Sequence, residues 1–166
     1  MTQILQCDVP QRVPAMKPSQ IAHKLVVQVT QSRELLLGLG ESIVRQKPSA
    51  DRWSIAEVVG HLVDSASNNH QRFIRAQESE SLTFPKYDQN SWTAKNAYAS
   101  ANWESLVELW FHYNLQLARV IEQISEEHLE KRCMIGSLEP CTLGWLVTDY
   151  FDHLVHHLKK IEERVG

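Results

Sequence analysis

Residues 103–124, WESLVELWFHYNLQLARVIEQI, carry the most regular hydrophobic pattern in this sequence. Large apolar side chains recur there at alternating intervals of three and four residues: Trp103, Leu106, Trp110, Tyr113, Leu117, Val120 and Ile124. This spacing places them on one face of an α-helix, as in the seam of a helical bundle. Aromatic residues on such a stripe more often pack in a core than line a cofactor pocket. The segment therefore predicts a helix that packs against other helices.

Three more helices are predicted on either side of this segment. The strongest start signal is in WSIAE, where Ser54 and Glu57 have the spacing of a capping box, so a helix should run from there to about residue 77. Apolar side chains at helical spacing predict an earlier helix, from near residue 19 to Pro48: Ile21, Leu25, Val29, Leu36, Leu39 and Ile43. The last helix should follow a cap at Thr142 and end near residue 163.

The segments between these helices contain no clear strand pattern. Residues 1–18 hold three prolines and no periodicity, which predicts an extended N-terminal arm. The connection over residues 78–100 is unusually long for a compact domain, so it is a candidate wall of a functional site. We therefore predict an all-α four-helix bundle with a long connection between the second and third helices, as one domain over residues 1–166.

Composition and charge exclude several classes of partner. Of the 166 residues, 43% are apolar and 22% charged, and the net charge is −3. Without a basic excess the chain is not expected to bind nucleic acid. No apolar run approaches the roughly 20 residues that a membrane helix needs, and no leader pattern is present, so we predict a cytoplasmic protein. The three cysteines, Cys7, Cys133 and Cys141, are widely spaced and predict reduced thiols.

The last helix contains DYFDHLVHHLKKIEE, residues 149–163, with three histidines in five positions. His153 and His157 fall on its inward stripe, whereas His156 lies about 100° around the helix from His157. Two imidazoles at i and i+4 share a face, and helices that bind metal use this spacing to present two ligands. An inward histidine can equally be a core residue held by a hydrogen bond.

A third ligand would have to come from another helix. In the segment 54–77 a polar row runs beside the apolar stripe: His61, Ser65, Asn68 and Arg72. Such a row faces a crevice between helices, which makes His61 the best candidate. The pattern is compatible with a three-histidine metal site, and also with buried histidines that only support the fold.

Three segments together resemble the DinB/YfiT-like (DinB_2) superfamily. They are RWSIAEVVGHLVDSASNNHQRF (52–73), YDQNSW (87–92) and DHLVHHLKKI (152–161). The resemblance implies an up-down-down-up four-helix bundle, commonly a homodimer. It also implies a divalent metal ion held by His61, His153 and His157. One departure is Lys160, because members of the superfamily often carry glutamine at this position.

The activity implied by the resemblance is that of a metal-dependent hydrolase or of a low-molecular-weight thiol S-transferase. A three-histidine site with an open coordination position could activate water for the first reaction or a thiol for the second. Imidazole ligands suit Zn or Ni first, with Fe or Mn as further candidates. The substrate would be a small molecule. The alternative is a non-catalytic, stress-associated bundle whose metal site is structural or vacant.

Two carboxylates near these histidines are interpreted differently. Asp149 precedes His153 by one turn and is the best candidate to orient a ligand imidazole through a hydrogen bond. Asp64 is a further candidate for this role, but it lies opposite the apolar stripe of its helix, which favours a solvated surface carboxylate. In the long connection, Tyr87, Asp88 and Trp92 are candidate pocket residues.

Overall fold

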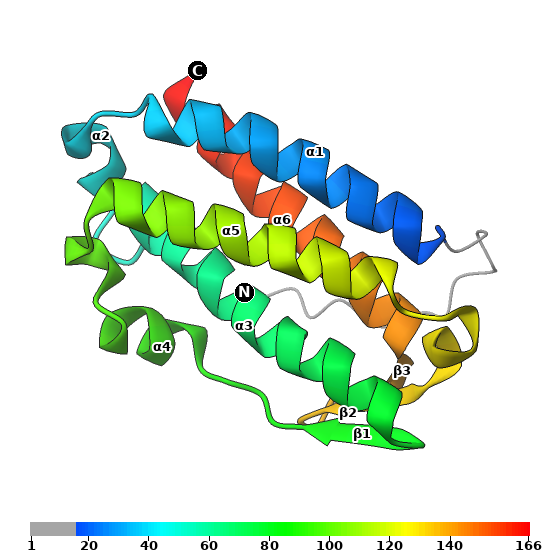
Figure 1. Cartoon of the computed structure of the whole chain (residues 1–166). Helices are drawn as coiled ribbons and strands as arrows, with labels where there is room; N and C mark the ends of the chain where they lie inside the picture. Colours follow the sequence, from blue (N-terminus) through cyan, green and yellow to red (C-terminus); the bar gives the residue numbers. More distant parts are fainter. Residues whose placement is uncertain (1–15) are drawn as a thin grey trace.

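The computed structural model describes residues 16–166 and contains four long helices. They are α1 (Pro18–Leu37), α3 (Ile55–Glu78), α5 (Trp103–Glu122) and α6 (Leu143–Val165). Helices α3 and α5 run in one direction and α1 and α6 in the other, which is the up-down-down-up order (Figure 1). Around the bundle, α1 packs against α5, α5 against α3, α3 against α6, and α6 against α1. The four-helix bundle is therefore confirmed.

The start of α3 is built as its sequence predicts. The Ser54 hydroxyl accepts a hydrogen bond from the Glu57 main-chain N–H at 3.2 Å, and the Glu57 carboxylate accepts one from the Ser54 N–H at 2.8 Å. Lys47 donates a further hydrogen bond to Glu57 at 2.9 Å. Burial raises the pKa of Glu57, but the hydrogen bonds from Lys47 and Ser54 outweigh it, so the pKa is lowered. The box satisfies main-chain donors that would otherwise be buried without a partner.

We expect Ser54→Ala to lower the free energy of unfolding by about 1 kcal/mol at pH 7, because the helix loses its cap. Ser67→Ala is the matched control on the same helix, since the Ser67 hydroxyl only donates to the main-chain carbonyl of Asp64. Folding lowers the pKa of Glu57, so its contribution is present at neutral pH and is lost as the pH falls through the lowered pKa. Urea titrations at pH 7 and pH 3 measure both effects. Equal losses in the two variants would contradict a role for the box.

The buried face of α5 differs in part from the predicted seam. Tyr113 and Val120 are only partly buried, whereas Val107, Asn114 and Ile121 are buried. A straight α-helix has 3.6 residues per turn, so an idealised seam with a period of 3.5 drifts by about 20° every seven residues. The polar Asn114 is accommodated because its side chain accepts a hydrogen bond from the Tyr150 hydroxyl and donates to the Trp110 carbonyl.

The first predicted helix is interrupted. Helix α1 ends at Leu37, and a separate short helix, α2 (Glu41–Arg45), follows Gly38 and Gly40. The break changes the register, so that Val44 is fully buried and Ile43 is 45% exposed. The prediction of one helix as far as Pro48 was therefore wrong, because two nearby glycines weaken the helix at that point.

At its N-terminus the helix begins slightly earlier than predicted. Pro18, which the sequence places at the end of an extended arm, is the first residue of α1, where its missing N–H costs nothing. The remainder of that arm, up to residue 15, lies outside the described residues, as does Cys7.

The long connection is more ordered than its sequence predicts. It contains a strand, β1 (Ser81–Phe84), a short helix, α4 (Gln89–Lys95), and the 3₁₀ turn η1 (Tyr98–Ser100). Because α3 and α5 run in the same direction, the chain must return along the length of the bundle between them, which explains the length of this connection (Figure 1). Another 3₁₀ turn, η2 (Glu126–Glu130), follows α5.

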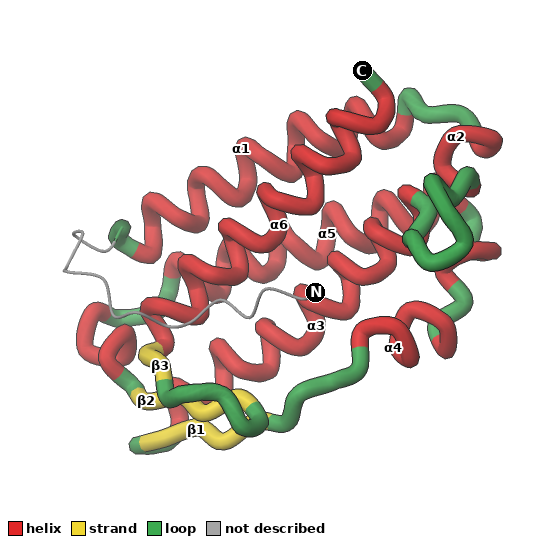
Figure 2. The backbone as a smooth tube through the Cα atoms, turned by 180° about the vertical axis from the view of Figure 1, so that it is seen from behind, coloured by secondary structure: helices red, strands yellow, loops and turns green. Residues whose placement is uncertain are grey.

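A small sheet, missed by the sequence analysis, closes one end of the bundle (Figure 2). Strand β1 pairs in parallel with β2 (Arg132–Ile135), and β2 pairs antiparallel with β3 (Cys141–Thr142). Strands of two to four residues are too short to produce a readable alternation of apolar and polar residues. The antiparallel pairing places Cys133 opposite Cys141, an arrangement that their spacing in the sequence does not reveal.

The buried apolar side chains form one cluster to which all four long helices contribute. Among the described residues, no helix is long and apolar enough to cross a membrane.

Candidate metal site

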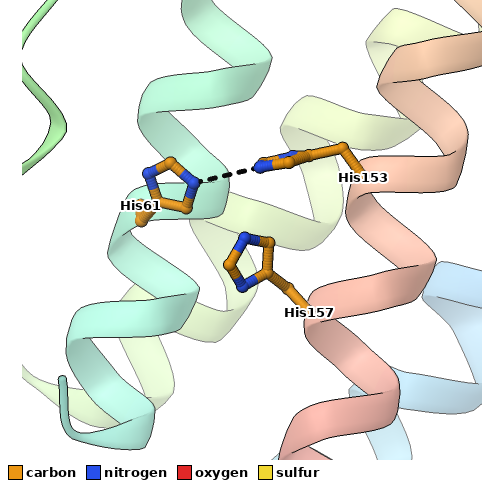
Figure 3. A group of neighbouring side chains, drawn as sticks. All are labelled: His61, His153 and His157. Carbon is orange, nitrogen blue, oxygen red and sulfur yellow. Dashed lines mark hydrogen bonds between the residues drawn. The ribbon is translucent and has the colours of Figure 1, made fainter. Parts of the chain in front are cut away.

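The three candidate histidines meet between α3 and α6. His61 comes from α3, and His153 and His157 come from successive turns of α6 (Figure 3). The Nε2 atoms of His61 and His153 are 3.2 Å apart, and one ring nitrogen from each of the three residues lies within 4.8 Å of the others. This is the one group of three or more candidate metal-binding side chains within residues 16–166.

All three imidazoles are neutral at pH 7. Burial, followed by the nearby His153, lowers the pKa of His61 to about 4. Burial lowers the pKa of His153 to about 4, with a further contribution from His156. Burial, then His153 and His61, lowers the pKa of His157 to about 3. Each ring therefore keeps a lone pair available at neutral pH without first releasing a proton.

The hydrogen bond between His61 and His153 leaves a buried nitrogen of His61 without a partner among the described residues. His61 is only 1% exposed, yet its Nδ1 atom has no partner within the described part of the chain. The partner of its Nε2 atom is another neutral imidazole. Convergent neutral nitrogen donors are the ligand set that Zn and other divalent transition metals accept in proteins, so the three residues fit such an ion.

The surroundings of His61 include an aromatic residue that the sequence analysis missed. The Trp53 ring lies beside the His61 ring, with centroids 5.0 Å apart. Trp53 directly precedes the cap of α3, a position that could have drawn attention to it. Asp149 lines the cavity next to His153, but the described residues show no hydrogen bond between its carboxylate and an imidazole. Its role in orienting a ligand stays a prediction.

Asp64 is buried, contrary to the prediction of a solvated carboxylate. It is 3% exposed, and one oxygen accepts hydrogen bonds from the Tyr98 hydroxyl at 2.8 Å and the Asn96 amide at 2.9 Å. Burial raises its pKa, although these two hydrogen bonds oppose the change. The long connection covers this face of α3, which helical periodicity alone could not indicate.

A glycine allows the connection to approach α3 this closely. A Cβ atom on Gly60 would lie 2.1 Å from Cγ of Tyr98, so no larger residue fits without displacing the ring. Gly60 directly precedes His61, and Asp64 follows one turn later. The contact therefore fixes the connection against the same part of α3 that carries the first histidine.

Two of the three histidines line cavities, and each lines a different one. The larger, of about 510 Å³, includes His153 together with Tyr87 and Asp88 of the long connection. The smaller, of about 180 Å³, includes His157 and Trp53. Asn90 of α4 lines both, so this short helix borders the two cavities. The long connection therefore does form a wall of the candidate site.

Not every predicted pocket residue lines these cavities. Trp92 lines neither cavity but packs against Tyr87, with ring centroids 4.8 Å apart. Of the polar row predicted on α3, Ser65 and Arg72 line the larger cavity, whereas Asn68 does not and its side chain donates to the Asp64 carbonyl. Asn69, which the predicted row did not include, lines the cavity as well. Lys160 lies at the smaller cavity beside His157.

The family model described as the DinB superfamily matches residues 25–161 of this sequence. That match covers most of the chain, which therefore belongs to the DinB superfamily. No curated protein matches this chain.

Two solved structures from Bacillus subtilis share the fold. One is YfiT, described as a probable metal-dependent hydrolase with an unusual four-helix bundle topology. It has a TM-score of 0.76 and 20% identity, with 93% of this chain and 90% of that chain covered. The other is YjoA, a DinB-like protein, with a TM-score of 0.61, 17% identity, and coverage of 88% and 90%. At these identities the likeness establishes the fold and not the activity.

Proposed function

We propose that this protein is a metal-dependent enzyme, with hydrolysis as the leading reaction class. The observation that carries the proposal is the convergence of three neutral imidazole nitrogens within 4.8 Å at the border of two cavities. His61, His153 and His157 would be the ligands of one divalent ion, of which Zn and Ni are the first candidates and Fe and Mn the next. The description of YfiT as a probable metal-dependent hydrolase supports the same reading.

The chain's own residues would provide binding, orientation and protection from solvent. The ion would supply a Lewis acid that lowers the pKa of a coordinated water or thiol. The two ligands on α6 are held one turn apart by the helix, and His61 is held by its buried position on α3. The connection fixed by Tyr98 and Asp64 closes one side of the site, where Asn90 borders both cavities.

A thiol S-transferase is the second candidate, and the smaller cavity favours it. Transfer needs two organic substrates at one centre, and the histidines are reached by two separate cavities. The smaller one is lined by three cationic side chains, Arg52, Lys160 and Arg164, against one carboxylate, Asp51, and this net positive charge suits an acidic thiol. In this reading Lys160 would attract a substrate. A homodimer and a cytoplasmic location also stay predictions.

The first experiment is elemental analysis of protein purified without a histidine tag, before and after incubation with Zn, Ni, Fe or Mn salts. We expect about one ion per chain. The loaded and chelated forms are then assayed with activated esters and amides, and separately with low-molecular-weight thiols plus an electrophile. Activity that disappears on chelation and returns with metal supports the proposal, and the active assay identifies the reaction class.

Absence of bound metal after all four incubations would overturn the proposal. Stoichiometric metal without activity in either assay would instead support the non-catalytic alternative, in which the site is structural.

A further inference from the structure

The larger cavity contains a cation that the three-histidine site does not use. Arg72 lies on α3, eleven residues after His61, which corresponds to about 16 Å along the helix axis. Its side chain lines the same cavity as His153, together with Ser65 and Asn69 from the intervening turns. Polar side chains therefore line the cavity that holds both Arg72 and His153.

The guanidinium group of Arg72 is held in place but lacks an anionic partner. Its carbon lies 5.4 Å from the centroid of the Phe84 ring, and one terminal nitrogen donates to the Asn69 side chain at 3.3 Å. Its Nε atom is buried without a hydrogen-bond partner in the described part of the chain. No ion pair within residues 16–166 includes Arg72. The donors that can meet a ligand are the remaining N–H groups of the two terminal nitrogens, since the buried Nε is closed off from solvent.

Of the two cations that line the cavity, Arg72 is the more buried, whereas Lys86 is exposed. Asp88 also lines the cavity, but its carboxylate accepts hydrogen bonds from the Asn90 and Ser91 main-chain N–H groups at the start of α4. Lys86 adds a second positive charge on the same connection. Asp149, on α6, is the opposing charge, and it lies too far from Arg72 for an ion pair.

The size and lining of the cavity suit a small organic ligand. About 510 Å³ falls within the usual range for small-molecule sites, and the Ser65, Asn69 and Tyr87 side chains add hydrogen-bonding groups. A planar guanidinium with several free N–H groups binds carboxylate or phosphate oxygens in pairs.

We propose that the larger cavity is a substrate subsite in which Arg72 binds a carboxylate or phosphate group. Because Arg72 and His61 lie on different turns of α3, the anionic group would be several bonds away from the atom that reacts at the histidines. The inference rests on the proposed function in one respect, because the bound molecule is a substrate only if the histidines hold a catalytic metal. Anion binding by Arg72 does not depend on the metal, since Arg72 is not part of the histidine cluster.

The test measures ligand binding to metal-free protein, treated with chelator, by calorimetry and by NMR shift changes. The probes are succinate, inorganic phosphate and the uncharged succinamide. We expect succinate or phosphate to bind, with at least a tenfold loss of affinity in Arg72→Gln and a smaller loss in Arg72→Lys. Succinamide should bind much more weakly than succinate. A preference between succinate and phosphate identifies the anionic group.

The matched control is Arg75→Gln, one turn further along α3, where the exposed side chain hydrogen-bonds to Gln71. It should bind the probes like the wild type. Circular dichroism checks that all variants are folded. Equal binding by wild type and Arg72→Gln, or by succinate and succinamide, would overturn the inference.

Elemental analysis of the Arg72→Gln variant separates this inference from the proposed function. We expect it to retain the wild-type metal content. If the wild type binds the anions through Arg72 but binds no metal, the subsite stands while the proposed enzyme fails. If the wild type binds metal but Arg72→Gln binds the anions as well as the wild type does, the subsite is wrong while the proposed metal site stands.

Discussion

Replacing His61 or His157 by alanine should abolish stoichiometric metal binding while the bundle stays folded. Each variant removes one of three nitrogen donors that lie within 4.8 Å of one another. Loss of an outer hydrogen-bond partner of a metal ligand weakens affinity by about 10–100-fold, so loss of a ligand should weaken it by more. Elemental analysis after dialysis, and competition with a chromogenic chelator, measure the change.

His156→Ala is the matched control for this experiment. His156 lies next to His157 on α6 but is exposed and outside the cluster, so its loss should leave the metal content unchanged. Thermal unfolding of the metal-free proteins provides the second readout. His61 has no hydrogen bond at Nδ1, so its removal should not unfold the chain. Unfolding of metal-free His61→Ala would indicate a structural histidine and contradict our assignment.

The largest loss of stability is expected at the centre of α5. Trp110 is fully buried and is among the largest side chains in the core, so Trp110→Ala should lower the free energy of unfolding by about 3–5 kcal/mol. The indole N–H has no partner among the described residues, and removing it recovers a small part of that loss. Urea titration followed by circular dichroism measures the change.

Trp145→Ala provides the control, because Trp145 is 45% exposed at the start of α6 and its removal leaves no internal cavity. We expect a change within about 0.5 kcal/mol. Similar losses for the two tryptophans would mean that the predicted core face of α5 does not dominate stability.

The local signals in the sequence were sufficient for the four long helices and for two of their caps. Ser54 with Glu57, and Thr142, act through main-chain groups no more than three residues away, so local sequence determines them. The same holds for the spacing of His153 and His157 on one face of α6. Gly38 and Gly40 are a local signal of the same kind, but the prediction of one helix as far as Pro48 did not take into account that they interrupt it.

Other features depend on which elements meet in space. The sheet at the end of the bundle joins residues 81–84 with 132–135, and Asp64 is buried because residues distant in sequence, Asn96 and Tyr98, cover it. No periodicity within one segment encodes such contacts. Asn69 lines the cavity and Asn68 does not, and this too depends on how α3 is oriented about its axis relative to the neighbouring helices.

By itself, the sequence therefore determined the four long helices, most of their inward positions and the choice of three candidate ligands, because each depends on a repeat of about 3.6 residues or on a cap. Only the tertiary structure decided that the nitrogens of His61, His153 and His157 converge, and that Arg72 shares a cavity with His153. The distance between side chains on different helices is set by how the whole core packs, and burial then keeps the three imidazoles neutral.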